Sequence, residues 1–176
     1  MEPGSKSNLK QQIAALRSSN RSVILTTVKD LRADGDVSVL PELFNLLLIQ
    51  EDGEIQGEIS ALLNDLKEQE AAEILAGAIS DPEFEEIQTI LVAACWQNGL
   101  SYARHIPVFV KVVIEGSYPA AIEAFTVIEE AVGELEPEAR DEVLRSLKSR
   151  AAEVDDQKKA LYVELVRVIE NYGSDS

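Results

Sequence analysis

The sequence predicts an all-α fold built from stacked, antiparallel helical hairpins. Apolar residues recur at spacings of three and four almost throughout, as at Ile55, Ile59, Leu62 and Leu66, and this is the period of an amphipathic helix. No stretch alternates strictly enough to predict a strand. The chain also repeats itself with a unit of about 33 residues, and periods of this length are typical of stacked supersecondary units.

The repeat becomes visible when residues 40–62 are laid over residues 106–128, a constant offset of 66. Apolar residues then fall on apolar residues, and Ile59 falls on Phe125. A third copy fits between them, because Ile59 falls on Leu91 at an offset of 32 and Leu91 falls on Phe125 at a further 34. We therefore predict about five hairpins.

Breakers divide the chain into ten helices, and polar residues mark their starts. Asp81 before Pro82 predicts an N-cap followed by proline at the first helical position, and Ser117 and Ser101 are expected to act similarly. The ten predicted helices span residues 7–17, 20–33, 37–50, 54–67, 69–79, 82–97, 101–115, 118–134, 137–152 and 156–172.

Pro41 and Pro107 occupy equivalent positions in two units, several residues inside the predicted helices 37–50 and 101–115. Proline in a helix interior removes a backbone hydrogen bond and crowds the preceding turn. We therefore expect each proline to bend its helix.

The stretch from Leu75 to Phe109 resembles HEAT-type repeats of the armadillo-type helical repeat class. An apolar first helix ends at Ile79, the turn Asp81-Pro82 follows, and a second apolar helix precedes Gly99 and the next proline-bearing helix. The resemblance implies a right-handed α-α superhelix, a HEAT-like α solenoid, of about five hairpins. We expect one domain over 1–176, with the clearest repeats at 36–134 and flexible ends at 1–6 and 173–176.

The chain departs from the HEAT pattern where many units carry a basic residue near the start of the second helix. Gln56, Gln88 and Ile122 stand there instead, so a ladder of Asp–Arg pairs between units is not expected. Stacking should then depend mainly on apolar burial. The expected core residues are Leu43, Leu47, Ile59, Leu62, Ile79, Ile87, Leu91, Val108, Phe109, Val112, Phe125 and Ile128.

The net charge of −16 is unevenly distributed. Residues 1–32 carry six basic and two acidic side chains, whereas residues 33–139 carry three basic and 22 acidic ones. Such an acidic protein repels nucleic-acid phosphate, so nucleic acid is not an expected partner. The charge favours a basic protein or peptide or a divalent cation as partner, or serves solubility alone.

The sequence predicts a soluble protein with no membrane contact. No stretch approaches 18 uninterrupted apolar residues, and the first residues lead into a polar helix instead of an apolar signal core. One cysteine, Cys95, cannot form an intrachain disulfide. A cytoplasmic location is the simplest expectation.

No catalytic or metal-binding signature is found. The single histidine, His105, cannot form a paired-histidine metal site, and Cys95 lies on the apolar side of its helix, as expected of a buried small residue. Residues 52–63 imitate a calcium loop but carry Leu63 where the bidentate Glu should be. We therefore expect no catalytic residues, no metal and no cofactor.

Superposing the second helices of the units defines a candidate partner-binding surface on an inner, concave wall. Trp96 would be its apolar anchor inside an acidic rim, and tryptophan is enriched among residues that dominate interface energy. The alternative is that Trp96 packs against the turn at Tyr118 or against the next unit. The candidate residues are Gln56, Ser60, Asn64, Gln88, Val92, Trp96, Ile122, Thr126 and Glu130.

As the resemblance to HEAT proteins implies, the expected function is a non-catalytic scaffold or protein–protein interaction module that binds a basic protein or peptide. Two alternatives stay open. One is a HEAT-like lyase or modifying enzyme acting on a substrate in its groove. The other is a structural adaptor that self-associates, with basic residues 1–32 of one copy meeting the acidic centre of another.

Overall fold

The structure, a computed structural model, describes residues 3–174 and is all-helical over that range. Over these residues, six short 3₁₀ segments precede or follow the α-helices. They are η1 Val37–Val39, η2 Pro82–Ile87, η3 Ala103–His105, η4 Val132–Glu134, η5 Ala151–Glu153 and η6 Asp156–Lys158. The α-helices are α1 Pro3–Leu16, α2 Arg21–Asp34, α3 Leu40–Ile49, α4 Gly53–Asn64, α5 Glu70–Ile79, α6 Gln88–Asn98, α7 Ile106–Glu115, α8 Tyr118–Ala131, α9 Pro137–Ser149 and α10 Lys159–Asn171.

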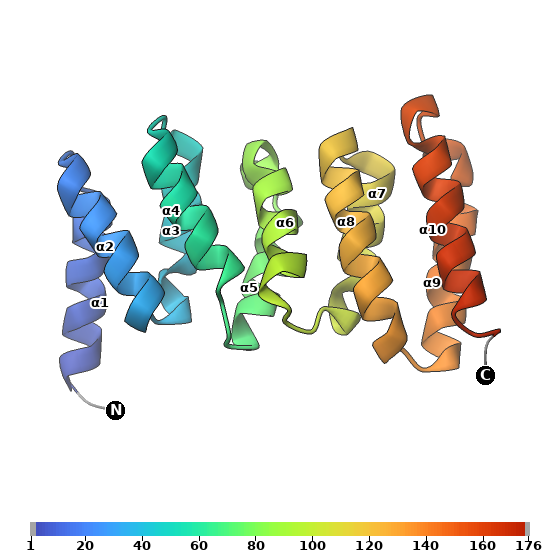
Figure 1. Ribbon diagram of the computed structural model, residues 1–176, viewed down its shortest axis with the longest axis horizontal. Helices are drawn as coiled ribbons and strands as arrows, with labels where there is room; N and C mark the ends of the chain where they lie inside the picture. Colours follow the sequence, from blue (N-terminus) through green and yellow to red (C-terminus); the bar gives the residue numbers. More distant parts are fainter. Residues whose placement is uncertain (1–2, 175–176) are drawn as a thin grey trace.

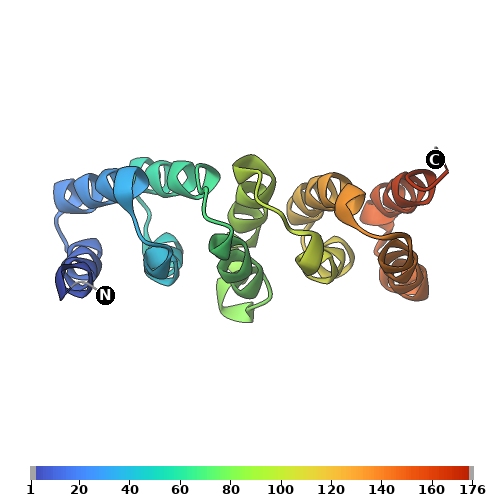
Figure 2. The same ribbon diagram turned by 90° about the horizontal axis from the view of Figure 1, so that it is seen from below.

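Consecutive helices form antiparallel pairs that stand side by side in a row, from α1–α2 at one end to α9–α10 at the other (Figure 1). Seen along the pairs, the even-numbered helices form one layer and the odd-numbered helices form the other (Figure 2). The even layer is continuous, because α2, α4, α6, α8 and α10 each pack against the next. The row is nearly straight in both views.

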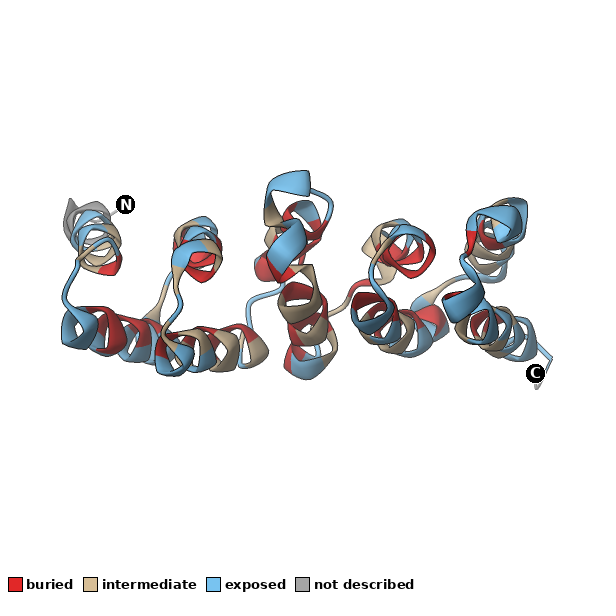
Figure 3. Ribbon diagram, turned by 90° about the horizontal axis from the view of Figure 1, so that it is seen from above, coloured by how far each residue is buried: buried red, intermediate tan, exposed pale blue. Residues whose placement is uncertain are grey.

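The core lies between the two layers, where buried residues face one another (Figure 3). Of the predicted core residues, ten are buried, and Phe109 of α7 is completely enclosed. Val108 and Phe125 are only half-buried and pack against the edge of the core. Their full burial was therefore a wrong prediction.

The two repeated prolines do not bend their helices. Each follows a 3₁₀ turn, η1 or η3, and occupies the second position of an α-helix, α3 for Pro41 and α7 for Pro107. A backbone N–H in the first turn of an α-helix has no intrahelical partner, so proline removes nothing there. The sequence period did not separate the 3₁₀ turn from the α-helix that continues it.

Two of the three predicted N-cap residues, Asp81 and Ser117, are confirmed. The Asp81 carboxylate accepts a hydrogen bond from the Glu83 N–H at 2.9 Å, and the Ser117 hydroxyl accepts one from the Ala120 N–H. Asp52, the first residue of the calcium-like segment, caps α4 in the same way. Ser101 is not a cap, because its hydroxyl donates to Glu134 at 2.6 Å instead.

The helix boundaries lie within about four residues of the predicted ranges, but several predicted helices contain a 3₁₀ turn. The predicted helix 82–97 is divided into η2 and α6, and the helices 37–50 and 101–115 begin as 3₁₀ turns. The predicted flexible ends fall partly outside the described residues, while residues 3–6 belong to α1.

Polar contacts between neighbouring pairs repeat at the spacing of the sequence repeat. Arg32 pairs with Asp65 across 33 residues, and Gln69 exchanges two hydrogen bonds with the backbone of Ser101 across 32. Arg150 pairs with Glu115 across 35 residues. Gln56, Gln88 and Ile122 form no such ladder, but arginines elsewhere on the helices make acid–base pairs between units that the sequence did not predict.

Lys158 joins the last pair to the one before it. Its side chain is 2% exposed, and its ammonium donates to the carbonyls of Ile114 at 2.6 Å and Gly116 at 2.8 Å. These carbonyls lie at the end of α7, where the last carbonyls of a helix lack intrahelical partners and the helix dipole favours a cation. The lysine therefore satisfies the carbonyls at the end of the helix.

Candidate functional site

The even layer presents an uncharged helix between two acidic ones. α6 has the sequence QTILVAACWQN and carries no charged side chain. On one side of it, α4 contributes Glu54 and Glu58, and on the other side α8 contributes Glu123, Glu129 and Glu130. An uncharged helix bordered by carboxylates suits a basic ligand.

Two exposed large apolar side chains of this layer lie on α8, and Val23 of α2 and Val163 of α10 are exposed as well. Tyr118 and Ile122 are 39% and 40% exposed, and they stand one helical turn apart on the same side of α8. Thr126 continues the row, and its hydroxyl donates to the Ile122 carbonyl at 3.3 Å. Glu130 stands one turn further and is exposed.

Trp96 of α6 meets this row from the side. It is half-buried, and its indole N–H donates to the Glu123 carboxylate on α8 at 2.5 Å. The ring edge is thus held by α8, while part of the ring stays accessible. We call Trp96, Tyr118, Ile122, Glu123, Thr126 and Glu130 the candidate surface.

The hydrogen bond corrects the predicted register of Trp96. Superposition of the repeats placed Trp96 beside Glu130, but the structure pairs it with Glu123. The alternative prediction, that Trp96 packs against the next unit, is confirmed in part, since the indole donates a hydrogen bond to that unit and the side chain is partly buried.

Val92 does not belong to the candidate surface. It is completely buried, with a relative exposure of 0%, so its prediction as a partner-binding residue was wrong. Leu91 of α6 is buried like its equivalent Ile59 of α4, so these two helices turn the same side inward, but Val92 is enclosed. The residue in register with Thr126 is therefore buried.

The remaining predicted residues lie away from the candidate surface or are held by the backbone. Gln56, Ser60 and Asn64 of α4 are half-buried. The Gln56 amide donates to the Gln50 carbonyl at 2.5 Å, and the Gln88 amide donates to the Ile79 carbonyl at 3.2 Å. Each of these glutamines thus joins the start of its helix to the end of the preceding helix.

Two residues of the candidate surface, Tyr118 and Glu123, were missed by the sequence reasoning. Tyr118 precedes Ile122 by four residues, a spacing that puts them on one face of a helix. That spacing was readable, but the superposition of second helices began at Ile122. Glu123 had no sequence signal, because its role depends on the distance between α6 and α8.

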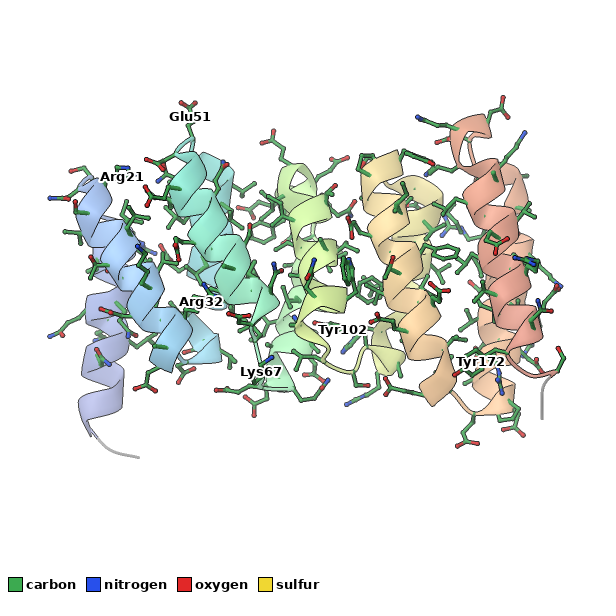
Figure 4. The ribbon with its side chains drawn as sticks, in the orientation of Figure 1. Arg21, Arg32, Glu51, Lys67, Tyr102 and Tyr172 are labelled. Carbon is green, nitrogen blue, oxygen red and sulfur yellow. The ribbon has the colours of Figure 1, made fainter. Side chains whose placement is uncertain are left out.

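The three arginines near the N-terminus form ion pairs within the molecule. Arg17 pairs with Glu42, and Arg21 pairs with Asp52 and Glu54. Figure 4 shows Arg21 and Arg32 reaching from α2 toward the neighbouring pair. The Arg21 hydrogen bond to Asp52 lowers the pKa of that carboxyl group. Much of the positive charge of this region therefore balances carboxylates of the same chain.

Cys95 has the environment of a buried structural residue. Its thiol donates to the Leu91 carbonyl at 3.3 Å, and burial raises its pKa to about 12. The neighbouring Tyr102 hydroxyl, whose pKa is also raised by burial, donates to Asn98, and Asn98 donates to the Leu63 carbonyl of the preceding pair. A thiol so protonated is not a nucleophile at neutral pH.

His105 lies half-buried before α7. Within residues 3–174 no three His, Cys, Asp or Glu side chains are placed so that they could hold a metal ion. No described helix is long and apolar enough to cross a membrane.

Comparison with known proteins adds little to this description. No family model and no curated protein matches the chain. Among solved structures, the crystal structure of an engineered protein, a Northeast Structural Genomics Consortium target, is similar with a TM-score of 0.44 and 16% sequence identity. The match covers 97% of this chain and 82% of that one.

Proposed function

We propose that the chain is a non-catalytic HEAT-like scaffold that binds a basic segment of another protein on the candidate surface. The observation that carries the proposal is the position of Trp96, Tyr118 and Ile122 beside the carboxylates of α8. Aromatic residues with apolar neighbours supply binding energy, and surrounding charge supplies orientation and a faster encounter. The 33-residue repeat and the row of helical pairs support membership of the HEAT or armadillo class, with its right-handed superhelix.

A segment with leucine or another apolar residue on one side and lysines on the other fits this surface. Its apolar side would cover the exposed parts of Tyr118 and Ile122. Its lysines would reach Glu129 and Glu130, which make no ion pair within the described chain. Such a partner is consistent with a cytoplasmic location, which we propose together with the function.

The test uses the fluorescence of Trp96, the only tryptophan. We expect a synthetic amphipathic peptide with basic and leucine-bearing faces to shift its emission and to bind more weakly as salt is raised, because screening reduces the attraction of exposed charges. Ile122→Ala is expected to weaken binding about tenfold, the effect of losing one anchor worth ~1.4 kcal/mol.

The charge contribution is tested with adjacent glutamates. Glu129→Lys with Glu130→Lys should weaken peptide binding, whereas Asp141→Lys with Glu142→Lys on α9 changes the net charge equally in the other layer and should not. Equal loss in both double variants would show that the peptide responds to overall charge and would contradict a defined surface.

A further inference from the structure

A groove separates the third pair from the fourth on the side away from the candidate surface. Its volume is about 210 Å³, and it is lined by residues from the end of α5, from η2 and from α7. Pockets for whole small molecules measure about 300–1,000 Å³. The groove is therefore of a size for one long side chain.

The groove has an apolar floor and an acidic rim. Ile79, Val108 and Val112 line the floor, and Asp81, Glu85 and Glu115 stand at the rim together with one cation, Lys111. This arrangement matches a side chain with an apolar stem and a charged end, because lysine buries its methylene groups against apolar surface while its ammonium contacts carboxylates.

The chain itself shows what fills the equivalent place one unit later. There, Lys158 donates to the last carbonyls of α7, and Arg150 pairs with Glu115 at 2.5 Å. Arg150 lies 35 residues after Glu115, and Glu115 lies 35 residues after Ser80 at the end of α5. At the earlier junction Glu115 therefore takes the place of the arginine.

The charges of that earlier junction are only partly balanced. Glu115 is paired with Arg150 and Lys111. Asp81 caps η2, and Glu85 is exposed and makes no ion pair within the described chain. Asp81 and Glu85 thus line the groove without an ion pair among the described residues, because its cation Lys111 pairs with Glu115, while the junction between the fourth and fifth pairs contains its own lysine and arginine.

We propose that the groove between η2 and α7 binds a lysine side chain of a partner protein. The stem lies on Ile79, Val108 and Val112, and the ammonium sits between Asp81 and Glu85. The groove shares no residue with the candidate surface. The lysine site and the proposed function can therefore be tested independently.

The experiment is an NMR titration of the ¹⁵N-labelled full chain with a five-residue peptide that has one central lysine between alanines. We expect shifts of the amide signals of residues 79–88 and 108–116. The same peptide with acetyl-lysine keeps the stem and removes the charge, and we expect it to bind at least fivefold more weakly.

Asp81→Asn with Glu85→Gln removes the rim charges, and asparagine preserves the cap. We expect this variant to lose the shifts in 79–88 and 108–116, while Glu129→Gln with Glu130→Gln retains them. Equal binding of the acetylated peptide, or shifts confined to α8, would overturn the proposal. If the amphipathic peptide fails to bind the candidate surface while the lysine peptide binds the groove, the proposed function is contradicted and the lysine site is supported.

Discussion

Single residues show how this chain buries polar groups without leaving them unpaired. Cys95, Asn98 and Tyr102 come from α6 and the segment that follows it, and each makes a hydrogen bond in the interior. Asn98 is 6% exposed and reaches the Leu63 carbonyl of the preceding pair. A buried polar group that is satisfied in only one arrangement favours one register of the two pairs.

The raised pKa of Cys95 gives a pH-dependent prediction. Between its ordinary value of 9.0 and about 12, the thiol ionises in the unfolded chain but not in the folded one. The stabilisation it contributes is therefore complete below pH 9 and is lost as the pH rises toward 12. Urea titrations of the wild type and Cys95→Ala across this range should show a smaller fall in the unfolding free energy for the variant; parallel falls would contradict it.

Phe109 should be the residue of α7 whose loss costs most. It is 0% exposed, and its ring meets Tyr102 edge-on, with ring centroids 5.6 Å apart. We expect Phe109→Ala to lower the unfolding free energy by ~3–5 kcal/mol, as for other buried aromatic residues. Phe125→Ala is the matched comparison, and its cost should be smaller because Phe125 is half-buried. Equal costs in urea unfolding would refute this ranking.

The sequence predicted the positions of the helices along the chain well. It predicted less well which side of each helix is exposed. The three-and-four period found all ten α-helices. It did not separate 3₁₀ turns from α-helix. For this reason Pro41 and Pro107 were predicted to lie in helix interiors, although each is the second residue of its α-helix. The period also gave no sign that Val92 is enclosed, because its burial depends on how the neighbouring helices pack against α6.

Part of the candidate site was predictable because it follows the period of α8. Ile122, Thr126 and Glu130 are four residues apart, and the structure places them in one row. The bond from Trp96 to Glu123 was not predictable, because it depends on the angle and distance between two helices. Sequence spacing carries no information about that distance.

Lys158 should stabilise the packing of the last pair, α9–α10, against the fourth pair, α7–α8. Lys158→Met keeps the buried stem but leaves the carbonyls of Ile114 and Gly116 without their donor. We expect a loss of about 2 kcal/mol or more in unfolding free energy, the cost of unsatisfied buried polar groups. Hydrogen exchange should rise first in α9 and α10.

The neighbouring Lys159 provides the control for that experiment. Its ammonium pairs with Asp156 at the surface, where both side chains are largely exposed. Lys159→Met should leave the unfolding free energy nearly unchanged. If both lysine variants behave alike, the buried bonds of Lys158 contribute no more than a surface pair.

Across the whole molecule, contacts join each pair mainly to its neighbours. α2, α4, α6, α8 and α10 form a continuous layer, and the side-chain hydrogen bonds between neighbouring pairs join residues 25 to 44 positions apart in the sequence. Stability in such an arrangement is approximately a sum of unit and nearest-neighbour contributions. The 33-residue repeat predicted this locality, although the individual Arg–Asp pairs were not expected.

The overall charge should make stability depend on ionic strength. With 32 acidic and 16 basic residues, like-charge repulsion acts across the folded body. The surface ion pairs are exposed, and each contributes at most about 1 kcal/mol. We therefore expect the Tm to rise by a few degrees between about 20 mM and about 500 mM NaCl, as screening increases. A lower Tm at high salt would show that the ion pairs outweigh the repulsion.

The bonds between neighbouring pairs also determine how the chain would respond to a pulling force. Gln69 and Ser101, or Arg32 and Asp65, close loops of about one unit, and each loop is fastened to the next in series. A molecule stretched between its two ends would therefore yield stepwise. Each rupture would release one hairpin and lengthen the chain by roughly 100 Å, the extended length of about 33 residues.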